Sequence, residues 1–97
     1  MGGSPKGDTV TVIRTVKIVN RQGLHARPST RIVEIANRHK SSITLRVGDL
    51  TANAKSVLSL LSLAAPQGTE LTIEAAGEDE AAAVAALAGE VERGFGE

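Results

Sequence analysis

A proline at position 28 restricts where a helix can begin in this chain. Residues 26–38 carry apolar side chains at helical spacing, and a helix tolerates proline only in its first turn, where the missing N–H costs no hydrogen bond. We therefore expect a helix over residues 26–38, preceded by a glycine-containing loop over residues 20–24. His25 then stands at the junction between the loop and the helix.

Alternating apolar and polar residues predict four strands, and apolar residues at helical spacing predict two more helices. The strands lie somewhere within residues 9–19 and over residues 43–47, 50–53 and 69–75, and the helices over residues 55–63 and 79–93. Gly48 and Asp49 suggest a tight turn between the second and third strands, and Gly94 is a plausible stop for the last helix. The order β-α-β-β-α-β-α predicts an α+β fold of two layers, an antiparallel or mixed sheet with helices on one side.

The composition excludes several classes of function. The 97 residues suffice for one domain, residues 10–97, after a polar segment over residues 1–9 that we expect to be a flexible extension. The absence of cysteine excludes thiolate chemistry, and a single aromatic residue, Phe95, leaves no base-stacking surface for nucleic acid. No segment has the apolar run of a signal peptide or a membrane span, so we expect a cytoplasmic protein without membrane insertion.

The net charge is zero, but the charges are unevenly distributed along the chain. Ten of the eleven Lys and Arg residues lie at or before Lys55, and eight of the eleven Asp and Glu residues lie at or after Glu70. Two solvated helical faces of opposite sign would explain this division. The basic residues around the histidine loop and its helix could instead steer an acidic partner; they are Arg21, Arg27, Arg31, Arg38 and Lys40.

The residues around His25 favour phosphate chemistry. The first turn of a helix leaves backbone N–H groups unpaired and carries the positive end of the helix dipole, so it attracts anions. Here the amides of Ala26 and Arg27, together with the Arg27 guanidinium, form a small anion cradle beside the ring. A neutral imidazole there can attack a phosphoryl donor, and the cradle then stabilises the phosphohistidine. Gly23 lets the preceding loop take a positive φ angle or approach a partner closely.

Other interpretations of His25 stay open at this point. The residue can serve only as a polar N-cap in a non-catalytic interaction domain whose charge asymmetry drives assembly. A metal site is a weaker interpretation because the other histidine, His39, lies fourteen residues away and cysteine is absent, and we expect neither a metal nor another cofactor. An independent kinase or phosphatase would need a nucleotide-binding glycine loop or a paired acid, and the chain has neither.

The run Gly23-Leu24-His25-Ala26-Arg27-Pro28 resembles the active-site signature of HPr, the histidine-containing phosphocarrier family of the bacterial phosphotransferase system. The resemblance extends from about residue 16 to residue 92. It includes Ala54-Lys55-Ser56 before an apolar helix and Gln67-Gly68-Thr69 before the last strand. It implies an open-faced β-sandwich, with a four-stranded antiparallel sheet and three helices on one face.

The resemblance also implies roles for particular residues. His25 would accept a phosphoryl group on Nδ1 from phosphorylated enzyme I and pass it to an EIIA-type domain, while Arg27 and the amides of Ala26 and Arg27 stabilise the phosphate. The protein would be a monomeric carrier that relays a group and has no turnover of its own. Ser56 would be a regulatory site for an HPr kinase/phosphorylase, although capping of the second helix alone explains a serine there. The residues that match the exposed docking patch of the family are Val57, Leu58 and Leu61.

Several positions depart from the pattern of the sugar-type family members. Ser29 and Thr30 add hydroxyls near the site where alanines are common, and Glu34 and Asn37 stand where lysines are frequent on the surface that faces enzyme I. The ending over residues 93–97 is similar to endings in the nitrogen-related branch, NPr. The residues leave the choice between a sugar-type and a nitrogen-related regulatory phosphocarrier open.

Overall fold

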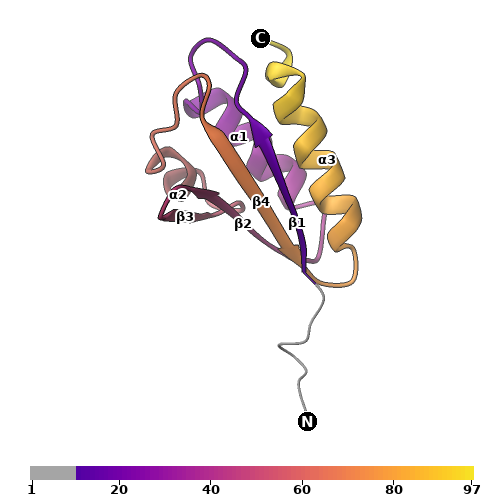
Figure 1. The fold of residues 1–97 in the computed structure, drawn as a ribbon. Helices are drawn as coiled ribbons and strands as arrows, with labels where there is room; N and C mark the ends of the chain where they lie inside the picture. The colour runs from indigo at the N-terminus through magenta and orange to yellow at the C-terminus, as the bar shows by residue number, and fades with distance from the viewer. Residues whose placement is uncertain (1–10) are drawn as a thin grey trace.

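The computed structural model describes residues 11–97, so the extension expected over residues 1–9 lies outside the described part. The elements follow the predicted order and are β1 (Val12–Lys17), α1 (Ala26–Ala36), β2 (Ser42–Val47), β3 (Leu50–Asn53), α2 (Val57–Leu61), β4 (Glu70–Ala76), α3 (Glu80–Glu92) and the 3₁₀ turn η1 (Gly94–Gly96). The strands form one antiparallel sheet in the order β1-β4-β2-β3 (Figure 1). The predicted α+β fold, a four-stranded antiparallel sheet with three helices, is confirmed.

The core lies between one face of the sheet and the helices. The alternating inward residues of the strands, such as Leu45, Leu71 and Ile73, are almost completely buried. Helix α3 packs on β1 and β4, and α1 packs against α2 and α3. Helix α1 contributes Ile32 and Ile35 to the core. Val33, also apolar and on the same helix, is only partly buried.

Two helices are shorter than their patterns predict. Helix α1 ends at Ala36 rather than residue 38, because the N–H groups of Arg38 and His39 bond three residues back, to the carbonyls of Ile35 and Ala36, and not four residues back as in an α-helix. Helix α2 covers Val57–Leu61 rather than residues 55–63. Its first turn follows Ser56, whose Oγ accepts a hydrogen bond from the Ser59 N–H at 3.2 Å, so the capping role expected of this serine is observed.

A carboxylate joins two loops at the end of the sheet opposite the histidine. Asp79 accepts hydrogen bonds from the backbone N–H of Lys40 at 2.9 Å, from the N–H of Ser41 at 3.0 Å and from the Ser41 hydroxyl. The Ser41 hydroxyl and the Lys40 amide lower the pKa of Asp79 to about 2. The start of α3 is thereby fixed to the start of β2.

No helix within residues 11–97 combines the length and the apolar character needed to cross a membrane.

Candidate functional site

The histidine loop is held against the segment that follows α2. Gly23 has a φ of +69°, and a Cβ at this position would lie 2.3 Å from the Ala65 carbonyl oxygen and 2.8 Å from the Pro66 Cα. The next residue, Leu24, is buried and donates its N–H to the same Ala65 oxygen at 2.8 Å. Both properties expected of Gly23, a positive φ and a close approach, are therefore present, and the close approach is to the chain itself.

His25 stands directly before α1, in an extended conformation. Its backbone carbonyl accepts the hydrogen bond from the Ser29 N–H at 3.0 Å, whereas its side chain forms no capping hydrogen bond. The ring is 31% exposed. The interpretation of His25 as a side-chain cap of the helix therefore has no support in the geometry.

The imidazole is instead held by the last residue of the chain. His25 Nε2 lies 2.9 Å from Oε2 and 3.2 Å from Oε1 of Glu97. An ionised carboxylate can only accept hydrogen bonds, so Nε2 must carry the proton of the neutral ring. The lone pair of the ring is then on Nδ1, which is the nitrogen that can act as a nucleophile.

Glu97 is kept ionised by its own contacts. Asn20 donates its Nδ2 to Glu97 Oε1 at 2.9 Å, and this hydrogen bond is the main reason that the pKa of Glu97 lies below its ordinary value. Burial opposes this effect and raises the pKa, whereas the hydrogen bond and charge of His25 and the charge of Arg27 lower it further. Glu97 is thus an acceptor at neutral pH.

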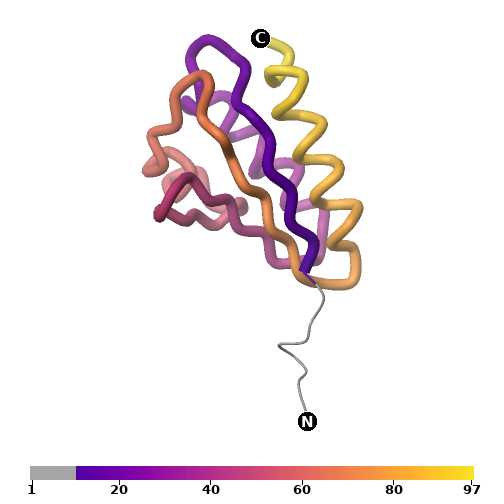
Figure 2. The backbone as a smooth tube through the Cα atoms, in the orientation of Figure 1, coloured from indigo at the N-terminus to yellow at the C-terminus, as the bar shows by residue number. Residues whose placement is uncertain are grey.

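A tight turn brings Glu97 to the histidine. Gly94, Phe95 and Gly96 follow α3 with φ angles of +65°, +59° and +75°, so the chain reverses over three left-handed residues. Gly94 therefore ends the helix as predicted, and the turn itself was not predicted. Figure 2 shows this C-terminal turn and the loop after β1 at the same end of the molecule.

The phosphate cradle predicted around His25 also includes the Arg21 side chain. His25 and Arg27 line an open pocket of about 520 Å³ together with Arg21, Gln22 and Glu97. Within residues 11–97, the amides of Ala26 and Arg27 donate no backbone hydrogen bond, so they are available to an anion. The site therefore offers two guanidiniums and two free amides.

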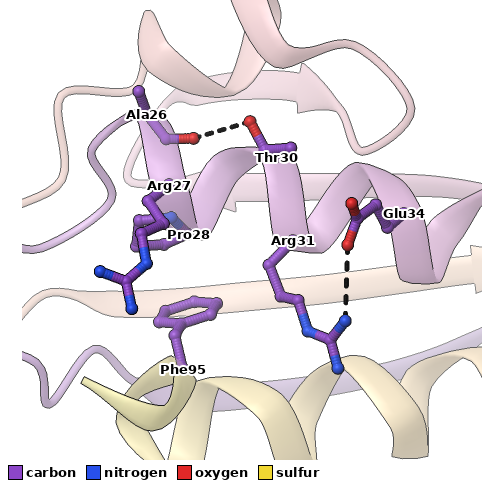
Figure 3. Close-up of a pocket in the computed structure, with 7 residues that line it drawn as sticks. All are labelled: Ala26, Arg27, Pro28, Thr30, Arg31, Glu34 and Phe95. Atoms are coloured by element: carbon purple, nitrogen blue, oxygen red, sulfur yellow. Dashed lines mark hydrogen bonds and ion pairs between the residues drawn. The ribbon is translucent and has the colours of Figure 1, made fainter.

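A second pocket lies on the other side of Arg27 (Figure 3). Its lining residues come from α1, between Ala26 and Glu34, and from η1, and the Arg27 side chain extends toward the Phe95 ring. Arg31 lies at its rim, where it pairs with Glu34 at 3.4 Å and with the buried Glu90 at 3.3 Å. Arg31 is therefore largely neutralised, unlike the other arginines expected to steer a partner, Arg21, Arg27 and Arg38.

The two hydroxyls expected near the site have different environments. Ser29 is completely buried, and its Oγ has no hydrogen-bond partner in the described part of the chain. Thr30 is exposed and donates its hydroxyl to the Ala26 carbonyl at 2.9 Å. The prediction that Ser29 places its hydroxyl near the site is wrong, because this side chain faces the protein interior.

The predicted docking patch is exposed on α2. Leu58 is 81% exposed and Leu61 is 37% exposed, whereas Leu60 is buried and Val57 is half-buried. Leu61 also lines a groove beside His25 and Leu24. The alternative that all the apolar residues of this helix are core is wrong, because five residues on one turn and a half cannot all face the sheet.

Two contacts of the site could not be found by sequence reasoning. Glu97 reaches His25 from a distant part of the chain, and an acidic residue five positions beyond a helix carries no pattern that points to a histidine 72 positions away. Asn20 lies five residues before His25, but its contact is with Glu97, 77 positions away, so its role in the site was missed with that of Glu97. The described residues contain no group of three or more His, Cys, Asp or Glu side chains that could hold a metal ion.

Comparisons with known proteins identify the family. The family described as PTS HPr component phosphorylation site matches residues 12–93. The chain is 42% identical over 76 residues to the phosphocarrier protein HPr of Treponema pallidum, which covers 78% of this chain and 86% of that protein. It is 40% identical over 89 residues to the phosphocarrier protein NPr of Proteus mirabilis, which covers 91% of this chain and 99% of that protein.

The fold agrees with these relatives. The crystal structure of HPr-C-His from Thermoanaerobacter tengcongensis superposes with a TM-score of 0.85 at 37% identity, covering 89% of this chain and 97% of the other. The family resemblance first seen in the Gly23 to Pro28 run is thus confirmed over residues 12–93. The chain belongs to the HPr family and is a phosphocarrier of the phosphotransferase system.

Proposed function

We propose that His25 is the residue that carries the phosphoryl group. The observation that carries this proposal is the contact of Glu97 with Nε2, which leaves the lone pair on Nδ1. Nδ1 attacks the phosphorus of the donor, an Nδ1–P bond forms, and the bond from phosphorus to the donor breaks. The reverse sequence at an acceptor regenerates the neutral ring.

Arg27 and the free amides of Ala26 and Arg27 stabilise the transferred group. The phosphoryl oxygens bring negative charge to the start of α1, where the helix dipole and the guanidinium favour it. Replacement of Arg27 by Gln keeps the side-chain length but removes the charge. We expect Arg27→Gln to slow phosphorylation by about tenfold or more, the cost of one charge-assisted hydrogen bond.

Enzyme I is the proposed donor and an EIIA-type domain the proposed acceptor. Both would dock on the patch formed by Val57, Leu58 and Leu61, which adjoins the His25 groove. One exposed apolar patch serves two partners in turn if the protein acts as a monomer. This exchange with soluble components would take place in the cytoplasm.

Ser56 is the proposed regulatory site, phosphorylated by an HPr kinase/phosphorylase. Its Oγ is half-buried and occupied by the Ser59 N–H, so modification must replace that hydrogen bond with a phosphate oxygen. The added charge next to the docking patch would weaken exchange with enzyme I. The test is incubation with ATP and such a kinase: modification of the wild type but not of Ser56→Ala supports the proposal, and an unmodified wild type rejects it.

The branch of the family decides which donor is the natural one. The relatives include both an HPr and an NPr at similar identity, and the NPr alignment covers more of this chain. Glu34 also places an acidic group, paired with Arg31, on the exposed side of α1. We therefore keep a nitrogen-related regulatory role as the second candidate, which a faster reaction with nitrogen-type than with sugar-type enzyme I would support.

The test of the His25 proposal is incubation with phosphoenolpyruvate and each type of enzyme I, followed by intact mass. We expect the wild type to gain the mass of one phosphoryl group, which acid then removes, and His25→Ala to gain none. No gain by the wild type with either enzyme would reject the proposal and return the non-catalytic interaction domain as the explanation.

A further inference from the structure

Asn20 is a buried polar residue next to the phosphorylation site that no part of the proposed transfer uses directly. Its side chain is 6% exposed, and its Nδ2 donates two hydrogen bonds, to the Gly23 carbonyl at 2.8 Å and to Glu97 Oε1 at 2.9 Å. The first bond closes the histidine loop, and the second fixes the carboxylate that holds His25 Nε2. One amide group therefore connects the loop, the C-terminus and the ring.

We infer that Asn20 is a positioning residue for the phosphoryl acceptor: through Glu97 it keeps the proton of His25 on Nε2 and the lone pair on Nδ1. Both groups that Nδ2 contacts are acceptors, so the orientation of the Asn20 amide is determined by its neighbours. The Glu97 carboxylate holds Nε2 only while its own position is fixed. Asn20 fixes this carboxylate through its hydrogen bond, and without Asn20 the ring can rotate or change tautomer.

Stability alone does not explain this residue. Asn20 Oδ1 is buried and has no hydrogen-bond partner among residues 11–97, and an unpaired buried acceptor is destabilising. A smaller residue would avoid this cost. A buried polar atom without a partner lowers stability. Such a residue at the edge of a reacting site is expected when it is kept for its function.

The test compares Asn20→Asp with a matched control that contacts the same loop. Asn20→Asp keeps the volume, removes both donated hydrogen bonds and places a second acceptor against Glu97. Gln67→Ala is the control, because the Gln67 amide also donates to a carbonyl of this loop, that of Val19 at 3.0 Å, but contacts neither Glu97 nor His25. Both variants loosen the loop, and only one affects the carboxylate.

The direct readout is the tautomer of His25, measured by ¹⁵N NMR of the ring in alkaline solution without any partner protein. We expect the wild type and Gln67→Ala to hold the proton on Nε2, and Asn20→Asp to give a mixture of tautomers. Transfer from enzyme I should fall about tenfold in Asn20→Asp. The Glu97→Gln variant should show the same mixture, and adding Asn20→Asp to it should change the mixture no further.

The inference rests on the proposed role of His25 but fails separately from it. If folded Asn20→Asp keeps a single tautomer with the proton on Nε2, Asn20 is only a structural residue, whatever the transfer rate. If the tautomer responds as expected but the wild type accepts no phosphoryl group, the positioning is correct and the proposed function is wrong. Asn20→Ala provides a second variant if Asn20→Asp does not fold.

Discussion

Replacement of Ser29 by alanine should stabilise the protein. Ser29 is the fourth residue of α1, is completely buried, and has no partner for its hydroxyl in the described chain. A buried, unpaired hydroxyl costs about 1–3 kcal/mol. Alanine also has the higher helix propensity, by a few tenths of a kcal/mol. Loss of the packing contacts of one oxygen atom offsets less than about 1 kcal/mol of this gain.

The net expectation is an increase of about 1 kcal/mol in the free energy of unfolding. With an m-value of about 1 kcal/mol/M, which is typical of a small domain, the urea midpoint should rise by about 1 M. The melting temperature should rise by roughly 4–8 °C. Urea titration followed by circular dichroism at neutral pH measures the first, and calorimetry the second.

Thr30→Ala is the matched control for this prediction. It deletes a hydroxyl and a methyl group from the same turn of α1, but this hydroxyl is exposed and bonded to the Ala26 carbonyl. Its effect should stay within about 0.5 kcal/mol. A Ser29→Ala protein that folds normally and is less stable than the wild type would refute the reasoning, because the hydroxyl would then have a partner in solution.

Three further perturbations follow from the contacts described above. Asp79 has a lowered pKa, so its contribution to stability is complete above its ordinary pKa of 3.8 and is lost as the pH falls toward about 2. Urea midpoints measured against pH should show this loss of stability. The same pH dependence should be absent from Asp79→Asn. Gly23→Ala should cost more than about 2 kcal/mol of stability, because the methyl group meets the Ala65 carbonyl and the φ is left-handed; an unchanged urea midpoint would contradict this. Leu58→Ser should leave the urea midpoint nearly unchanged and raise the enzyme I concentration needed for half-maximal phosphorylation, whereas unchanged kinetics would exclude Leu58 from the docking surface.

Local patterns in the sequence were sufficient to predict the fold. Pro28 fixed the start of α1 to the residue, and the alternation around Leu45 and Ile73 gave the strands that form the core. The helix ends were less accurate, because they depend on local hydrogen bonds, such as those of Arg38 and His39 after α1 and the Ser56 cap before α2, rather than on apolar spacing. The type and order of the elements thus follow from period and turn residues, whereas their exact lengths do not.

The site was predictable only where its residues are neighbours in the chain. His25 and Arg27 belong to one short run, and the first turn of a helix supplies the amides. Glu97 comes to the ring through tertiary structure, by way of three left-handed residues. Asn20 is close to His25 in the chain, but its role depends on Glu97 and was missed for that reason. The inward direction of Ser29 was also missed, because a residue in the first turn next to a proline has no helical repeat before it to show its face.

The most direct test of the account is the position of the phosphoryl group on the ring. The protein is labelled with ¹⁵N, phosphorylated with phosphoenolpyruvate and enzyme I, and examined by NMR for the coupling between phosphorus and the ring nitrogens of His25. The account predicts phosphorus on Nδ1, with the proton retained on Nε2 against Glu97. Phosphorus on Nε2, or on any residue other than His25, would contradict it.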